Sequence, residues 1–124
     1  MSIKIVTDST CDLPQSVIAD LGITVVPLFI NFGDRGYRDG VDLSRADFYA
    51  RLPQSNPLPT TAAPGHEVFK QAYEQLAQAG ATEILSIHIS ESLSATINVA
   101  KVAAQETTSV RVTAFDSRQL SLGT

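Results

Sequence analysis

A short stretch in the second half of the chain gathers hydroxyl groups in a place where a ligand could bind. Ser90 to Thr96 reads Ser-Glu-Ser-Leu-Ser-Ala-Thr and lies between an apolar run, Ile84 to Ile89, and an alanine-rich run, Ile97 to Ala104. This order predicts a turn from a buried strand into a helix. The N–H groups at the start of a helix have no partner inside it, so together with hydroxyl side chains they can hold a small anionic headgroup. The simpler interpretation is that Ser90 or Ser92 caps the helix.

Two other predicted strands also end in small polar residues. Asp8-Ser9-Thr10 follows the apolar run Ile3 to Thr7, and Asp116-Ser117 follows Val110 to Phe115. In open parallel sheets, ligands bind outside the carboxyl ends of the strands. If these strands are parallel neighbours, their ends form a pocket rich in hydroxyl groups, and Thr60-Thr61 in a proline-rich loop could lean over the same edge.

The strand-end carboxylates leave an enzymatic alternative open. Asp8 or Asp116 could act as a nucleophile or a metal ligand, which would make the protein a small-molecule phosphotransferase or hydrolase. Two carboxylates without a third acidic or histidine partner form an incomplete metal site, so we expect no metal. Carboxylates at such turns more commonly accept hydrogen bonds from backbone and serine donors and orient the loops.

Several familiar catalytic patterns are missing from the sequence. No Gly-x-Gly-x-x-Gly motif follows the first strand, and neither a Walker loop nor a Gly-x-Ser-x-Gly elbow is present. The sequence therefore lacks the backbone cradle of a nucleotide site and the nucleophile turn of an α/β-hydrolase. His66 and His88 are typical of structural or solvated histidines, and Cys11 is typical of a small, partly buried filler. We expect no catalytic residues.

The elements that position these residues are predicted by hydrophobic periodicity. Apolar runs predict strands at 3–7, 23–30, 84–89 and 110–115. Amphipathic segments predict helices at 12–22, 44–53, 66–79 and 97–104. The alternation predicts one α/β domain whose mostly parallel sheet is covered by helices on both faces, a three-layer arrangement. The 124 residues suffice for one such core but not for a second domain.

Proline and glycine predict the connections between these elements. Pro27 cannot donate to a sheet ladder, so the run at 23–30 is expected at a sheet edge or at a bulge. Gly33-Asp34-Arg35-Gly36 predicts a tight turn, after which Tyr37 to Gly40 returns as the second strand of a small hairpin. Residues 54–64 hold three prolines and predict a stiff, extended surface loop.

Two of the predicted helices have specific start signals. Asp12 lies where the N-cap of the first helix would be, with Pro14 in the first turn and Gly22 at the end. Ser44, with Asp47 three residues later, has the form of a capping box. Both signals predict that a side-chain oxygen holds a free backbone N–H group.

Charge and cysteine content narrow the range of partners. The chain has 9 Lys and Arg against 13 Asp and Glu, a net charge of -4, with no basic cluster. Nucleic acid and an anionic membrane surface are therefore not expected as partners. A single cysteine forms no intramolecular disulfide, and the sequence holds neither a signal-peptide core nor a run of about 20 apolar residues. We expect a cytoplasmic protein without an integral membrane segment.

Seven short motifs resemble the amino-terminal domain of the DegV family, in the same order and over essentially the whole chain. They are Ile5-Val6-Thr7-Asp8-Ser9-Thr10, Asp12-Leu13-Pro14, Val26-Pro27-Leu28, Tyr37-Arg38-Asp39-Gly40-Val41-Asp42, Pro59-Thr60-Thr61 with Pro64, Ser90 to Thr96, and Phe115-Asp116-Ser117. The resemblance implies a single DegV-like amino-terminal domain at 1–124, without the family's carboxy-terminal domain. It also implies a bacterial fatty-acid-binding protein that presents a long-chain fatty acid to a fatty-acid kinase, which phosphorylates the carboxylate.

The resemblance implies carboxylate-binding residues one by one. The family's Thr-Ser-x-Pro loop matches Thr61-Ala62-Ala63-Pro64 and its Ser-Gly-Thr matches Ser94-Ala95-Thr96, so Thr61 and Ser94 would bind the fatty-acid carboxylate. Alanine at 62 and 95 replaces the family's serine and glycine, and the methyl group of Ala95 would crowd or tilt the headgroup. The residues implied as supports are Asp8, Ser9, Thr60, Ala95, Thr96, Asp116 and Ser117. No Arg or Lys is expected beside the carboxylate, because the family supplies these groups from its second domain.

Three functions remain to be separated at this point. The first is a non-enzymatic carrier with a bound fatty acid and no cofactor. The second is the phosphotransferase or hydrolase; turnover with a metal and a phosphate donor that is lost in Asp8→Asn would favour it. The third is an interaction domain whose exposed face fits a partner domain, and concentration-dependent self-association without lipid would favour it.

Overall fold

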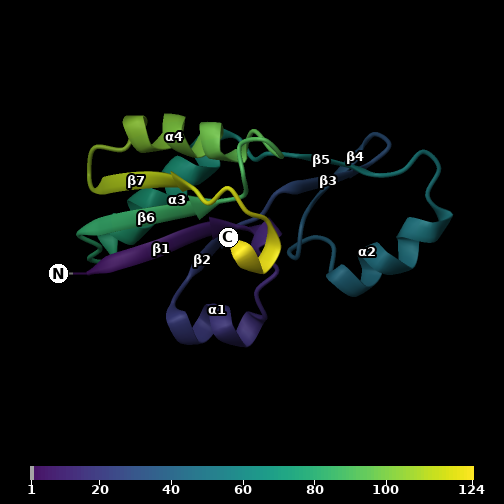
Figure 1. Ribbon diagram of the computed structural model, residues 1–124, viewed down its shortest axis with the longest axis horizontal. Helices are drawn as coiled ribbons and strands as arrows, with labels where there is room; N and C mark the ends of the chain where they lie inside the picture. Colours follow the sequence, from purple (N-terminus) through teal and green to yellow (C-terminus); the bar gives the residue numbers. More distant parts are fainter. Residues whose placement is uncertain (1) are drawn as a thin grey trace.

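The computed structural model describes residues 2–124, whose central feature is a parallel sheet (Figure 1). Its strands are β1 (Ile3–Asp8), β2 (Thr24–Val26), β6 (Glu83–His88) and β7 (Arg111–Asp116), in the order β2-β1-β6-β7. Neighbouring strands are parallel, with Thr7 opposite Ile87 and His88 opposite Asp116. The predicted α/β domain with a mostly parallel sheet is confirmed.

Helices cover both faces of this sheet (Figure 1). α1 (Gln15–Leu21) lies on one face, and α3 (His66–Gln78) and α4 (Thr96–Glu106) lie on the other. The chain moves outward from β1 to β2, then crosses back to β6 on the other side of β1 and continues to β7. Because βαβ crossovers are right-handed, this reversal places α1 opposite α3 and α4 and produces the predicted three layers.

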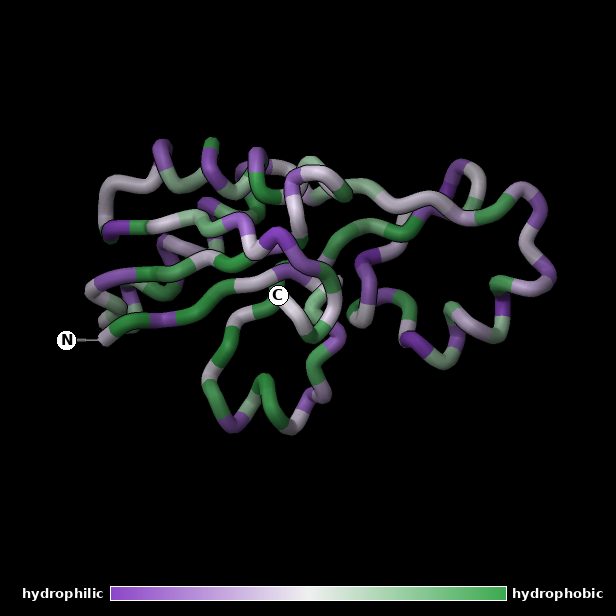
Figure 2. The backbone as a smooth tube through the Cα atoms, viewed as in Figure 1, coloured by the Kyte–Doolittle hydropathy of each residue, from purple (hydrophilic) through white to green (hydrophobic). Residues whose placement is uncertain are grey.

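The core lies between the sheet and helices α3 and α4. Val6, Phe69, Tyr73 and Ile84 are at most 2% exposed there. Ala100 of α4 is fully buried in the same cluster, and its small side chain lets the helix pack close to the sheet. Apolar residues run along β1 and β6 in Figure 2, whereas α4 alternates between apolar and hydrophilic residues as expected of a helix with one buried side. This packing holds α3 and α4 in fixed positions relative to the strand ends.

A second, smaller sheet extends from this core as an arm, residues 29–62 (Figure 1). Its strands are β3 (Phe29–Phe32), β4 (Arg35–Arg38) and β5 (Thr60–Ala62), antiparallel in the order β4-β3-β5. Helix α2 (Arg45–Arg51) and the short 3₁₀ turn η2 (Leu52–Gln54) complete the arm. The predicted hairpin is confirmed, but its turn is only Gly33-Asp34, because Arg35 and Gly36, predicted in the turn, pair with β3 as part of β4. Gly33 has a φ of 60°, a backbone angle that residues with a Cβ atom rarely adopt.

The run at 23–30, predicted as one strand, is instead two strands in different sheets. The chain leaves the main sheet after Val26, passes Pro27, and enters the arm at Phe29. Pro27 has no N–H group for a ladder, so the pairing breaks there. The predicted edge position is confirmed for β2. β5 was predicted as part of an extended loop, and it becomes a strand by pairing with β3.

The two predicted helix caps have different outcomes. Ser44 Oγ accepts a hydrogen bond from the Asp47 N–H at 3.1 Å, which confirms the cap of α2. The prediction for Asp12 is wrong: it has a φ of 56° at the end of the 3₁₀ turn η1 (Ser9–Cys11), and Pro14 occupies the N-cap position of α1. The Asp12 carboxylate accepts hydrogen bonds from Arg45 and Ser121 instead. Tertiary contacts therefore decide the role of this carboxylate.

Several loops gather at the carboxyl ends of the main strands. The 3₁₀ turn η3 (Ser121–Gly123) packs against η1, and the Ser90 N–H donates to the Gln119 carbonyl at 2.9 Å. The segments that follow β1, β6 and β7 thus contact one another directly. No helix formed by residues 2–124 is long and apolar enough to cross a membrane.

Candidate functional site

The loops that follow β1 and β6 meet at the topological switch point of the main sheet. The chain leaves β1 in one direction and returns to β6 on the other side of β1. Loops that diverge from two neighbouring strands in this way leave a crevice between them, which is where open α/β sheets bind ligands. Thr10 follows β1, Ile89 follows β6, and both line one cavity. The structure brings these two strand ends together, whereas the third predicted contributor, Asp116-Ser117, and the Ser90 to Thr96 turn lie outside the described lining of this cavity.

This cavity, which we call the Thr61 cavity, has a volume of about 250 Å³. Its apolar wall is formed by Leu28, Ile30, Phe48, Tyr49, Ile89 and Leu120. Its polar lining is formed by Thr10, Asp12, Asp39, Arg45 and Thr61. The arm supplies one side of the cavity and the loops after β1 and β6 supply the other. An apolar wall with a few polar groups suits an amphipathic ligand.

A larger cavity of about 480 Å³ lies beyond Arg45, between α1, β2 and the arm. Asp12, Asp39 and Arg45 line both cavities, so they form the partition between them. Among the described residues, the lining of this larger cavity includes neither Thr61 nor Ser94. The Thr61 cavity is therefore the candidate site.

Thr61 reaches this site because β5 pairs with β3. Thr61 lies opposite Ile30 in the antiparallel ladder, and Thr60 lies opposite Asn31. Successive side chains of a strand point to opposite faces. Both threonines are exposed, but only Thr61 lines the cavity together with Ile30, and Thr60 lies outside the lining as far as residues 2–124 define it.

Ser94 lies in the turn before α4, outside the described lining of the Thr61 cavity. Its Oγ accepts a hydrogen bond from the Thr96 N–H at 3.1 Å and lies 2.7 Å from the Thr96 Oγ1. Thr96 is fully buried. Ala95 is exposed with a φ of -79°, so this backbone position needs no glycine. Ser94, and not Ser90 or Ser92 as predicted, therefore accepts a hydrogen bond from a free N–H group in the first turn of α4.

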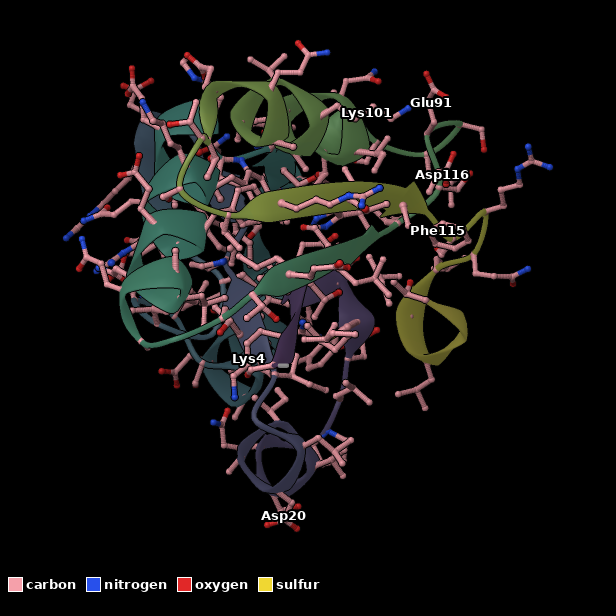
Figure 3. All side chains as sticks on the ribbon, turned by 90° about the vertical axis from the view of Figure 1, so that its left-hand side faces the viewer. Lys4, Asp20, Glu91, Lys101, Phe115 and Asp116 are labelled. Carbon is pink, nitrogen blue, oxygen red and sulfur yellow. The ribbon has the colours of Figure 1, made fainter. Side chains whose placement is uncertain are left out.

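Asp116 and Ser117 at the end of β7 hold the neighbouring turns. Asp116 accepts hydrogen bonds from the Glu91 N–H at 3.3 Å and the Arg118 N–H at 2.9 Å, and Ser117 Oγ donates to the His88 carbonyl at 2.7 Å. Figure 3 shows Glu91 and Asp116 at the same end of the sheet. These contacts fasten the serine-rich turn to β7.

Asp8 and Ser9 hold the loop that follows β1. One Asp8 oxygen accepts hydrogen bonds from the Thr10 N–H at 2.9 Å and from the Thr10 hydroxyl. Ser9 Oγ accepts a hydrogen bond from the Leu28 N–H at 3.0 Å, where the chain passes from the main sheet into the arm. Since Thr10 and Leu28 both line the Thr61 cavity, Asp8 and Ser9 support its wall from beneath.

Asp8 also belongs to a buried polar chain that sequence reasoning did not assemble. Tyr73 Oη donates to Ser86 Oγ at 2.7 Å, Ser86 Oγ lies 2.6 Å from His88 Nε2, and His88 Nδ1 lies 2.8 Å from the second oxygen of Asp8. With its proton on Nδ1, His88 donates to Asp8 and accepts from Ser86, so each member is satisfied. The strand register was the available signal, since Thr7 opposite Ile87 places Asp8 beside His88.

The order Ser86, His88, Asp8 matches that of a hydrolase triad, but its surroundings do not. All three residues are 0% exposed, and the serine oxygen already accepts a hydrogen bond from Tyr73. Burial raises the pKa of Tyr73 to about 12, although its hydrogen bond to Ser86 acts in the opposite direction. A substrate has no access to these groups. The buried polar chain of side chains joins α3 to β6 and β1. This placement gives His88 a structural role, as predicted, and argues against Asp8 as a nucleophile.

We expect Asp8 to make the stability of the protein sensitive to acid. Burial would raise the pKa of the Asp8 carboxyl, but hydrogen bonds from His88 and Thr10 outweigh burial and leave the pKa below its usual value. A carboxyl with a lowered folded pKa contributes stability that is complete above its unfolded pKa, about 3.9, and is lost as the pH falls through the folded pKa. Urea unfolding should therefore show a falling midpoint as the pH drops from about 5 to about 3.

Asp8→Asn tests this assignment. The variant should be less stable than the wild type at neutral pH, because the amide has no charge for His88 and Thr10 to stabilise. It should also lose less stability than the wild type on acidification. A variant whose midpoint falls in parallel with that of the wild type would show that other carboxyls carry the acid sensitivity.

Metal binding and thiol chemistry are the two remaining possibilities among the reactive side chains of residues 2–124. Within residues 2–124, no group of three or more His, Cys, Asp or Glu side chains is placed to hold a metal ion. Burial raises the pKa of the Cys11 thiol, which makes it a weaker nucleophile at neutral pH.

Comparisons with known proteins agree on one family. A family model described as "Uncharacterised protein, DegV family" matches residues 2–124. A DegV domain-containing protein of Deinococcus radiodurans is 45% identical over 123 residues, which are 99% of this chain and 43% of that protein. The chain thus spans less than half the length of this relative.

Solved structures share the fold closely. A DegV family protein from Thermus thermophilus, described by its fatty acid binding, has 40% sequence identity and a TM-score of 0.87. DegV from Bacillus subtilis, described as a fatty acid binding protein, has 32% identity and a TM-score of 0.92. Each likeness covers 98% of this chain and 43% of the other chain.

Proposed function

This chain belongs to the DegV family, and from that premise we propose that it binds a long-chain fatty acid in the Thr61 cavity. The observation that carries the proposal is the placement of the Thr61 hydroxyl on the same cavity as an apolar wall of six side chains, Leu28, Ile30, Phe48, Tyr49, Ile89 and Leu120. The hydroxyl donates to the carboxylate, and a hydrogen bond to a charged oxygen is stronger than one between neutral groups. Leu28, Ile30 and Ile89 contact the first methylene groups of the acyl chain of the fatty acid.

The size of the cavity supports a site that is completed by further residues. Its volume of about 250 Å³ is below the roughly 300–1,000 Å³ of cavities that enclose a ligand of drug size. The relative from Deinococcus radiodurans is more than twice as long as this chain, because the match covers 43% of it. We propose that residues 1–124 act as an amino-terminal domain and that a carboxy-terminal domain supplies the rest of the acyl wall.

Ser94 is the second proposed carboxylate contact. Its hydroxyl is part-buried and held by Thr96 through two hydrogen bonds. To reach a carboxylate, the Ser94 hydroxyl would turn away from the Thr96 hydroxyl, and the fatty acid would replace that hydrogen bond. Asp116 and Ser117 support this step by holding the serine-rich turn on β7.

The proposed role is that of a carrier without chemistry of its own. The carboxylate is held at Thr61, which is exposed, so it is presented to a separate fatty-acid kinase that phosphorylates it. A cytoplasmic location is part of this proposal, and the buried, unpaired thiol of Cys11 supports it because free thiols persist in reducing compartments.

The test compares two neighbouring threonines of β5. Thr61→Val keeps the shape of the side chain but removes the donor, and we expect it to weaken the binding of stearic acid by at least about tenfold, since a hydrogen bond to a charged group is worth about 1.5–3 kcal/mol. Thr60→Val makes the same change on the other face of the strand and should bind as the wild type does. Isothermal titration calorimetry on the full-length protein, which includes the proposed carboxy-terminal domain and is purified without detergent, gives these affinities.

Two results would contradict the proposal. One is a wild-type protein that neither binds stearic acid nor carries a lipid in native mass spectrometry. The other is equal affinity in the wild type and Thr61→Val, because the cavity would then not be the carboxylate site.

A further inference from the structure

Arg45, at the start of α2, binds residues from several distant segments. Its Nε and Nη2 atoms each donate to a carboxylate oxygen of Asp39 at 3.1 Å, and Nη1 donates to Asp12 at 2.6 Å. Nη2 also donates to the Ser9 carbonyl at 2.8 Å. Asp12 in turn accepts a hydrogen bond from Ser121 Oγ at 2.7 Å. We call Arg45, Asp12 and Asp39 the clamp.

The clamp fastens the arm to the carboxyl end of the main sheet. Arg45 and Asp39 belong to the arm, whereas Asp12 and the Ser9 carbonyl belong to the segment that follows β1. The Thr61 cavity is walled by these same two parts, with Thr61 on the arm and Thr10 after β1. The geometry of the clamp therefore sets the distance between the walls.

The clamp is also the partition between the two cavities. Its three residues line both the Thr61 cavity and the larger one beyond it. Charged groups that already satisfy one another gain nothing from contact with methylene groups and lose hydrogen bonds if they are pushed apart. The clamp thus closes this side of the Thr61 cavity to an acyl chain.

Arg45 itself is not available as a ligand for a carboxylate. Sequence reasoning expected no basic residue near Thr61, and Arg45 lines the same cavity, so that expectation is wrong. However, one guanidinium faces the two carboxylates of Asp12 and Asp39, which leaves the clamp with an excess negative charge. A fatty-acid carboxylate would have to displace Asp12 or Asp39 to bind Arg45 in the way that they do.

We infer that Arg45 is a positioning residue, which acts through Asp12 and Asp39 to hold the loop after β1 against the arm and so fixes the walls of the Thr61 cavity. The planar guanidinium bonds three partners at once, which the single ammonium group of a lysine cannot reproduce. The part of this inference that concerns a fatty acid rests on the proposed function.

Cys11 reports on the clamp without any ligand. It is the only cysteine in the sequence, is 5% exposed, and directly precedes Asp12. In Arg45→Met we expect the thiol to react about tenfold faster with an aromatic disulfide reagent, because the released loop opens more often. Arg45→Lys should react at an intermediate rate.

Arg38→Met is the matched control for both variants. The Arg38 guanidinium also holds one carboxylate with two N–H groups, at 3.1 and 3.0 Å from Asp42, but it lies outside the described lining of the Thr61 cavity. In Arg38→Met, Cys11 should react with the disulfide reagent at the same rate as in the wild type. If Arg45→Met fails to fold, Arg45→Lys provides the comparison.

Calorimetry with stearic acid on the same variants separates this inference from the proposed function. We expect binding to weaken about tenfold in Arg45→Met and to stay unchanged in Arg38→Met, since a loosened site must be ordered by its ligand. If Cys11 becomes reactive in Arg45→Met but the wild type does not bind stearic acid, the proposed function fails and the fastening role stands. An unchanged rate of Cys11 in Arg45→Met and Arg45→Lys overturns the inference, whatever the affinities are.

Discussion

Replacing His88 with leucine is expected to lower the free energy of unfolding by about 3–5 kcal/mol, the usual cost of leaving a buried charge, here that of Asp8, without its partner. His88 and Asp8 are both 0% exposed, and His88 Nδ1 lies 2.8 Å from the carboxylate. Leucine would leave this carboxylate without one of its hydrogen-bond donors on the buried face of the sheet that α3 covers. Ser86 would lose its acceptor. Urea unfolding followed by circular dichroism measures the change.

His66→Leu is the matched control for His88→Leu. His66 also pairs with a carboxylate, that of Glu106 at 2.6 Å, but its side chain is 43% exposed. Exposed pairs contribute about 0.2–1 kcal/mol, so the control should change the stability by no more than that. Equal losses in the two variants would show that burial does not govern the contribution of His88.

Replacing Phe69 with alanine is expected to destabilise the protein by a similar amount, about 3–5 kcal/mol. Phe69 is 0% exposed, its ring lies edge-on to that of His88 with 5.2 Å between centroids, and it also contacts the ring of Tyr73. Alanine would leave a cavity between α3 and the sheet, directly beside the buried polar chain. Chemical unfolding in urea gives the free energy, and a fall in the midpoint without a change in slope would identify a native-state effect.

Val68→Ala provides the comparison on the same helix. Val68 is 42% exposed, so removing its two methyl groups should cost less than about 1 kcal/mol. If Phe69→Ala were as mild as Val68→Ala, the packing of α3 on the sheet would not be the main source of stability in this part of the core.

The burial of His88 and Asp8 also bears on function, because it decides whether Asp8 could take part in an enzymatic reaction. A phosphotransferase or hydrolase would need Asp8 to be accessible to its substrate. The Asp8 carboxylate is instead fully buried, with hydrogen bonds from His88 and Thr10. Asp116 remains partly exposed, but it accepts hydrogen bonds from the Glu91 and Arg118 N–H groups. Both carboxylates therefore hold loops around the candidate site.

The clamp and the Thr61 cavity also show how the departures from the family pattern are accommodated. Ala95 has an ordinary helical backbone conformation, so its methyl group introduces no strain before α4. Ala62 follows Thr61 on the exposed side of β5 and lies opposite Phe29. Neither alanine removes a hydroxyl from the described lining of the cavity.

The sequence by itself determined the main elements and the places where polar residues follow them. Hydrophobic periodicity predicted the strands that became β1, β6 and β7 and the helices on the sheet, because these patterns depend on neighbours within one or two turns of chain. The same patterns identified Thr10 and Ser90 as residues beyond strand ends and Asp116 as a residue at one. The order of strands and helices then implied a mostly parallel sheet, since parallel strands need crossover connections.

Only the tertiary structure decided which of these polar groups face a cavity and which are held inside the fold. Thr61 lines the cavity because β5 pairs with β3, and Asp12 binds Arg45 because the arm folds back on the loop after β1. Asp8 meets His88 across 80 positions of sequence. Such contacts depend on strand register and on the packing of distant segments, which a local pattern of residue types does not contain.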